Sequence, residues 1–100
     1  MARNVYAGIG YGFNLETIEW PEELEELIEK NFESWRLEYS GYDEAGHYAI
    51  VYSPSVLELD WGEITTFNSG VANYPPIYQV TELSRITGKK LTLLGYAKMF

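Results

Sequence analysis

The chain has no cysteine among its 100 residues, which excludes disulfide bridges, thiol catalysis and cysteine-based zinc sites. No window approaches the roughly 20 apolar residues that a membrane-spanning helix needs. No apolar run of roughly 7–15 residues follows Met1, as a signal peptide would require. We therefore expect a cytoplasmic protein, and the absence of cysteine fits a reducing compartment.

Basic residues are also few, and the charge is unevenly distributed. Seven basic residues stand against fifteen acidic ones, which gives a net charge of −8. Residues 1–63 carry a net charge of −11, whereas residues 64–100 carry +3. Such an excess of negative charge repels nucleic acid and anionic membranes and favours basic protein partners.

The length and the 46% of hydrophobic residues predict a single domain, residues 1–100, with its own core. Alternating or β-branched segments predict strands at 5–13, 35–40, 47–53 and 91–100. Periodic apolar residues predict helices at about 21–32 and 77–87, the first opened by Pro21 and the second ended by Gly88. Their apolar stripes are Leu24, Leu27, Ile28 and Phe32, and Ile77, Val80, Leu83 and Ile86.

The predicted order, β-α-β-β-α-β, indicates an α+β fold of the ferredoxin-like type. Its four-stranded antiparallel sheet is expected to carry both helices on one face, with strand order 4-1-3-2 and the first strand central. Pro54 interrupts the third strand. A more open sheet, in which 56–61 or 63–67 forms an extra strand, is the competing interpretation.

One face of this sheet is expected to lack helices. The apolar residues from Val5 to Ile9 are expected to meet the helices, which leaves Tyr6, Gly8, Gly10 and Gly12 on the bare face. The glycines form a lane without side chains. Either Tyr48 and Tyr52 fill this lane within the monomer, or a partner protein or second copy approaches it closely. A ligand slot is the third alternative.

Two patterns that could carry chemistry fit poorly. Gly8-x-Gly10-x-Gly12 lacks the G-x-G-x-x-G spacing and the adjoining helix of a dinucleotide-binding loop. His47, the single histidine, has no nucleophile motif beside it, so a structural role is favoured over general-base catalysis.

Two further patterns are weighed as binding surfaces. The glutamates at 22–29 lie in a predicted helix, where a solvated face with Glu26 paired to Lys30 is favoured over a metal site or a dedicated interaction surface. Tyrosines on two strands imitate an RNA-binding sheet, but a chain of charge −8 would repel the RNA backbone. The loop 63–76 is either a recognition loop or an ordered loop that packs Phe67 over the core.

Two short segments, 4–11 (NVYAGIGY) and 59–62 (LDWG), resemble small acidic proteins encoded in bacteriophage genomes, a group without a settled function. The resemblance implies a protein made in the cytoplasm of a bacterial host, where it binds a host protein. It transfers no functional residue to this chain.

Our leading hypothesis is a non-enzymatic module without cofactor or metal, which binds a basic protein partner through its acidic half with tyrosine anchors. The candidate protein-binding residues are Tyr6, Gly8, Gly10, Tyr48, Tyr52, Glu22 and Glu26. The alternative is a homo-oligomeric structural protein that assembles through the open sheet face. A small enzyme is a third hypothesis, which the fold permits but no nucleophile–base pair or metal constellation supports.

Overall fold

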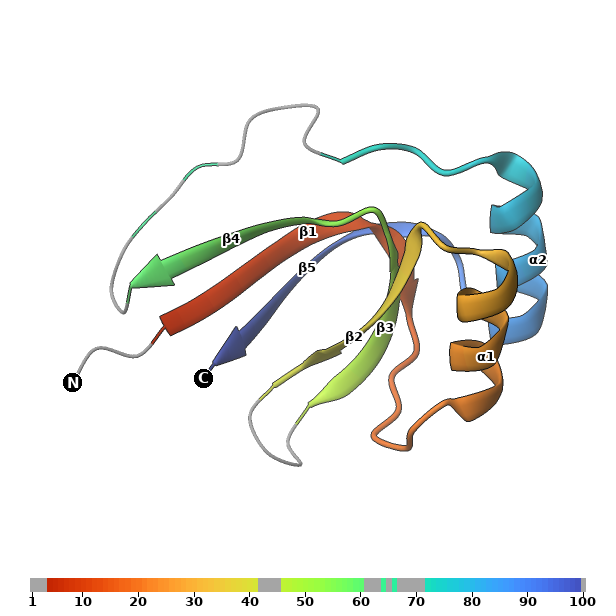
Figure 1. The fold of residues 1–100 in the computed structure, drawn as a ribbon, viewed down its shortest axis with the longest axis horizontal. Coiled ribbons are helices and arrows are strands. Elements are labelled where there is room, and N and C mark those ends of the chain that lie inside the picture. Colours follow the sequence, from red (N-terminus) through yellow and green to blue (C-terminus); the bar gives the residue numbers. More distant parts are fainter. Residues whose placement is uncertain (1–3, 42–45, 61–63, 65, 67–71, 100) are drawn as a thin grey trace.

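The computed structural model of the chain describes residues 4–41, 46–60, 64, 66 and 72–99. Within these residues it is an α+β structure with two helices and one antiparallel sheet of five strands. The elements are β1 (Asn4–Asn14), α1 (Glu22–Asn31), β2 (Trp35–Ser40), β3 (His47–Tyr52), β4 (Ser55–Asp60), α2 (Ile77–Thr87) and β5 (Thr92–Met99) (Figure 1). The predicted helices and strands agree with these bounds to within one residue at each end.

The α+β class is confirmed, whereas the four-stranded β-α-β-β-α-β order is not matched. The described residues follow the order β-α-β-β-β-α-β, because a further strand, β4, follows the third predicted strand. Ser53, with a φ of 39°, and Pro54 end β3, since proline has no amide hydrogen for a ladder bond. Pairing resumes at Ser55, so the extra strand of the competing interpretation is present at β4. The other segment considered for it, 63–67, lies mostly outside the described residues.

β1 is the central strand of the sheet. β3 pairs with its last residues, where Gly12 lies opposite Val51, and β4 pairs with its first half, where Val5 lies opposite Leu59. β3 and β4 therefore follow each other along one edge of β1. β5 runs along the other edge, and β2 pairs with β3.

The sheet folds back on itself, so that the β2–β3 hairpin lies across one face of β1 and β5 (Figure 1). The end of β2 meets β5, where the amide of Gly41 donates to the carbonyl oxygen of Ala97 at 3.3 Å. The Ser40 hydroxyl donates to the same oxygen at 3.3 Å. These bonds join the free edges of β2 and β5 at one point.

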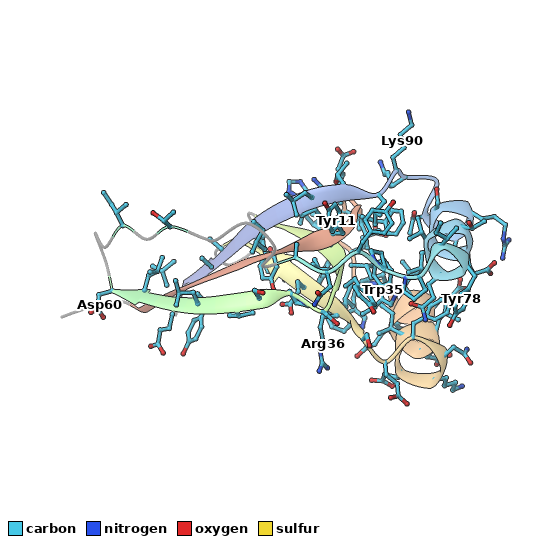
Figure 2. The ribbon with its side chains drawn as sticks, turned by 90° about the horizontal axis from the view of Figure 1, so that it is seen from above. Tyr11, Trp35, Arg36, Asp60, Tyr78 and Lys90 are labelled. Atoms are coloured by element: carbon cyan, nitrogen blue, oxygen red, sulfur yellow. The ribbon has the colours of Figure 1, made fainter. Side chains whose placement is uncertain are left out.

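The hydrophobic core lies between the helices and the outer face of the folded sheet. Its buried residues are Phe13, Ile28, Phe32, Trp35, Ile50 and Leu83. The Trp35 ring stacks on Phe13 with ring centroids 5.8 Å apart, and its Nε1 donates to Gln79 Oε1 at 3.0 Å. Figure 2 shows Trp35 beside the helices. This residue therefore connects β2 with both β1 and α2.

The two helices match their predicted apolar stripes to different degrees. In α1, Ile28 is buried and Leu24 and Leu27 pack against the core, as predicted. In α2, Leu83 is buried and Val80 packs against the core, but the side chains predicted at either end of the stripe are exposed: Ile77 by 75% and Ile86 by 42%. Gly88 ends α2 in the left-handed conformation, as predicted, with its amide donating to the Ser84 carbonyl oxygen at 2.9 Å.

The helices cover only one end of the sheet, so the prediction that residues Val5 to Ile9 meet them is wrong. Phe13 lies on the same face of β1 as Val5, Ala7 and Ile9, and it packs in the core. The other three residues lie beyond the part of the sheet that the helices cover. They belong to the part of the sheet formed by 4–9 of β1, 55–60 of β4 and 95–99 of β5, which we call the arm. Figure 1 shows the arm extending away from both helices.

Candidate protein-binding surface

The lane of glycines on β1 is filled by the chain itself. The ring of Tyr96 lies against Gly8, so closely that a Cβ there would overlap the ring. Val51 covers Gly10, with its Cγ1 2.7 Å from the place where a Cβ would stand. All three lane glycines are buried. The interpretation in which the lane is filled within the monomer therefore holds, and Gly8 and Gly10 offer no surface to a partner or second copy.

The residues that fill the lane differ from those predicted. Tyr48 pairs across the strands with Tyr39, and Tyr52 pairs with Trp35, so both tyrosines lie on the outer face with the core residues. Tyr52 packs on Trp35, with ring centroids 5.3 Å apart. A shift of one residue in strand pairing moves every side chain of a strand to the opposite face of the sheet. The alternation within β3 shows which of its side chains share a face, but it does not show which of the two faces meets the glycines of β1.

The Tyr96 ring lies inside the folded sheet, against Gly8, and carries a polar hydroxyl group. Its hydroxyl is buried and has no hydrogen-bond partner in the part of the chain that the structure describes. Burial raises the pKa of Tyr96 to about 12, and the nearby Glu38 carboxylate acts in the same direction. The hydroxyl is therefore neutral at ordinary pH.

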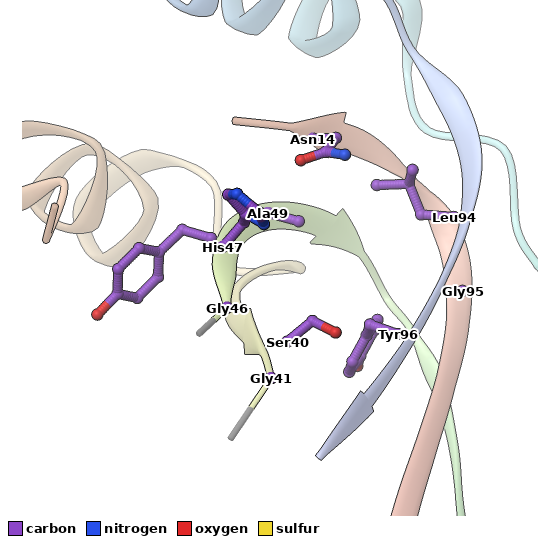
Figure 3. A pocket seen from close by; sticks show the side chains of 10 residues that line it. Asn14, Ser40, Gly41, Gly46, His47, Ala49, Leu94, Gly95 and Tyr96 are labelled. Atoms are coloured by element: carbon purple, nitrogen blue, oxygen red, sulfur yellow. The ribbon is translucent and has the colours of Figure 1, made fainter. Parts of the chain in front are cut away.

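A cavity of about 360 Å³ lies beside Tyr96 (Figure 3). It is lined by Asn14, by the residues of β2 and β3 next to the turn of their hairpin, and by residues 94–96 of β5. Ser40 and His47 both line it and are neighbours in the register of β2 and β3, but the Ser40 oxygen already bonds to the backbone of Ala97. The lining does not form a serine–histidine pair ready for nucleophilic catalysis.

A different surface is built around Trp20, which precedes α1 and is 51% exposed. Its Nε1 donates to Glu25 Oε2 at 2.6 Å. Its ring meets that of Tyr48 at 85°, with centroids 5.2 Å apart. One contact holds the polar edge of the indole and the other its apolar surface, so the ring has a fixed orientation while half of it faces solvent.

The chain between β1 and α1 places Trp20 over β3. The Asn14 side chain accepts a hydrogen bond from the amide of Glu16, whose φ of 53° turns the chain out of β1. The carbonyl oxygen of Thr17 then accepts from the amide of Tyr48 at 3.0 Å. Pro21 immediately precedes α1, one residue before the position predicted for it in the first turn of the helix.

Glutamates continue this surface along α1, and all of them but the half-buried Glu25 are exposed. Glu22, Glu25, Glu26 and Glu29 share one stripe at helical spacing, and Glu25 contacts Trp20. The predicted pairing of Glu26 with Lys30 is not among the ion pairs of the described residues. We call the group Trp20, Tyr48, Glu22, Glu25 and Glu26 the Trp20 surface.

The structure thus divides the candidate residues among three places. Tyr48, Glu22 and Glu26 belong to the Trp20 surface. Tyr52 packs on the core residue Trp35, and Tyr6 lies with Gly8 and Gly10 on the inner face of β1. Trp20 was missed by the sequence analysis, although a tryptophan just before Pro21 and an acidic helix start is a readable signal for an anchored side chain. The proposed recognition loop 63–76 falls largely outside the described residues.

Comparison with known proteins found no matching family model, no similar curated protein and no similar solved structure. Neither helix of the described chain has the length and apolarity needed to cross a membrane. The described residues contain no group of three His, Asp or Glu side chains placed to hold a metal ion.

Proposed function

We propose that the protein is a non-enzymatic binding module that docks a basic protein partner on the Trp20 surface. The supporting observation is a tryptophan held half-exposed by Glu25 and Tyr48 next to a stripe of exposed glutamates. Tryptophan and tyrosine are enriched among residues that dominate binding energy. Because the Trp20 ring is already oriented, little side-chain freedom is lost when a partner covers it.

The chemistry of the partner follows from the charge. The glutamate stripe and the net charge of −11 over residues 1–63 attract lysine and arginine side chains and repel anionic surfaces. If the phage resemblance holds, the partner is a host protein whose basic surface normally contacts nucleic acid. The acidic stripe would then take the place of phosphate groups.

The sheet supports a related proposal on the fold. β3 and β4 follow each other along the same edge of β1. This supports treating them as two halves of the third strand of a ferredoxin-like sheet, split at Ser53 and Pro54.

The proposed function is tested by titrating the labelled protein with an unstructured arginine-rich peptide and following its amide and indole NMR signals. We expect the indole signal of Trp20 and the amides of α1 to shift. Affinity should fall steeply from low to moderate salt, because contacts between exposed charges are screened. A matched acidic peptide should leave the spectrum unchanged.

Substitutions separate the aromatic anchor from the charge. Trp20→Ala should weaken peptide binding by about tenfold or more. Tyr78→Ala removes an even more exposed aromatic from α2, where the side chain is 69% exposed, and should leave binding unchanged. Glu25→Gln keeps an oxygen acceptor for the Trp20 indole but removes a charge, so a loss smaller than that of Trp20→Ala is expected. Equal binding by Trp20→Ala and the parent protein, or binding that is insensitive to salt, would contradict the proposal.

A further inference from the structure

The outer face of the arm is apolar and lies outside the helix-covered core. Register places Leu57 and Ala97 on either side of Ala7, and Leu59 beside Val5. Leu57 is 37% exposed, and Ala97 is also exposed. The residues that form this face, which we call the arm face, are Val5, Ala7, Ile9, Ser55, Leu57, Leu59, Gly95 and Ala97.

The arm face has no ionisable residue among the described positions, although the chain carries a net charge of −8. The two carboxylates of β4, Glu58 and Asp60, pair with Tyr6 and Asn4 and therefore alternate onto the opposite face. Figure 2 shows Asp60 at the far end of β4 from the helices. Two copies that meet through the arm faces thus bring no carboxylates of the arm opposite each other, whereas contact through α1 would oppose glutamates.

We infer that the arm face is a contact between two copies of this chain, stacked sheet on sheet about a two-fold axis. We place the two-fold axis between the two sheets, perpendicular to the strands and along the row Leu57–Ala7–Ala97. This arrangement places Leu59 of one copy over Ser55 of the other. On β4 the large Leu59 then meets a small residue, whereas Leu57 meets Leu57 of the other copy. Ala7 meets Ala7 at the centre, where small residues permit the spacing of about 10 Å that stacked sheets adopt.

The size of the arm face sets the strength of this contact. Three strands and six residue rows span roughly 14 by 20 Å, so two copies bury on the order of 600–800 Å². Standard interfaces begin at about 1,200 Å². The dimer is therefore expected to be weak and to form only at high protein concentration.

The contact is tested by sedimentation equilibrium from roughly 10 µM to 1 mM. The average mass of the parent protein should rise from that of a monomer towards that of a dimer. Leu57→Glu places a carboxylate in the centre of the contact and should weaken self-association by about tenfold or more. Val56→Glu is the matched control, because Val56 is 55% exposed, precedes Leu57 on the same strand and points to the opposite face. It should change the dissociation constant by no more than about twofold.

A milder pair of variants covers the case in which Leu57→Glu fails to fold. The chain has no cysteine, so Leu57→Cys and Val56→Cys each carry a single thiol. Leu57 lies in the row along which the two-fold axis runs, and the stacked sheets are about 10 Å apart. A thiol-reactive cross-linker that spans about this distance should therefore join two copies of Leu57→Cys and should not join two copies of Val56→Cys. A parent protein that stays monomeric at the highest concentration overturns the inference and shows that the arm face is covered in another way. Equal cross-linking of the two cysteine variants overturns it as well. Trp20→Ala should still dimerise, which keeps this test independent of the peptide-binding test.

Discussion

Replacement of Tyr96 by phenylalanine is expected to stabilise the protein. Tyr96 is 9% exposed, and its hydroxyl has no hydrogen-bond partner in the described part of the chain. A buried polar group left without a partner costs about 1–3 kcal/mol. Phenylalanine keeps the ring over Gly8 and removes only that group. The Glu38 carboxylate acts on this hydroxyl and offsets part of that cost, so we expect Tyr96→Phe to raise the free energy of unfolding by at most about 1 kcal/mol.

The same residue gives the parent protein a pH dependence of defined sign. Burial first, and the Glu38 carboxylate second, raise the pKa of Tyr96 from 10.0 to about 12. The folded state therefore holds the phenolic proton more tightly than the unfolded chain does. This contribution to stability is fully present below pH 10 and is lost as the pH rises to about 12. A shift of two pH units corresponds to at most about 2.7 kcal/mol, which we reduce to roughly 1–2 kcal/mol because solvent screens part of the interaction.

Urea denaturation followed by tryptophan fluorescence measures both effects. At about pH 8 the Tyr96→Phe variant should be more stable than the parent protein, and by about pH 11 the difference should grow. Tyr78→Phe removes an exposed hydroxyl from α2 and serves as the control for loss of a tyrosine. A Tyr96→Phe variant that is less stable at about pH 8 would show that the hydroxyl makes a favourable bond, and the reasoning from an unpartnered group would be refuted.

Three glycine substitutions test the close contacts of the backbone, each by urea or thermal unfolding. Gly12→Ala should cost about 3 kcal/mol or prevent folding, because the added Cβ would overlap the carbonyl oxygen of Ile50. Gly95→Ala is the tolerant counterpart, with a change within about 0.5 kcal/mol, since its Cβ would meet only the carbonyl oxygen of Gly8 at 3.8 Å. Gly88→Ala should cost about 1 kcal/mol through its φ of 70° alone, because nothing lies within 4 Å of the added carbon. Similar costs for Gly12→Ala and Gly95→Ala would argue against the close approach of β3 to β1.

The positions of the helices and strands could be predicted because their signals are local. The alternation in β1, Pro21 before α1 and Gly88 after α2 each act within a few residues. The interruption of the third strand was readable from Pro54 for the same reason. Steric and hydrogen-bonding constraints of this kind do not depend on distant partners.

The arrangement of these elements depended on contacts that no local pattern contains. Tyr96 lies over Gly8, far away in sequence, and the two are brought together by the register of β5 on β1. Alternation showed that Val5 and Phe13 share a face but not that the helices end before Val5. For the candidate site, the acidic stripe was foreseen, whereas Trp20 gained its role only through its contact with Tyr48 on β3.

The pairing of β1 with β5 has a consequence for how the molecule forms during synthesis. Val5 lies opposite Met99, so β1 must wait until β5 has also left the ribosome before its ladder is complete. Until then the backbone around Gly8 has no aromatic ring above it, and an aggregation-prone edge stays open. Closure over almost the whole chain is entropically slow. The nascent polypeptide is therefore expected to acquire protease resistance only once β5 has left the ribosome, in a single late step.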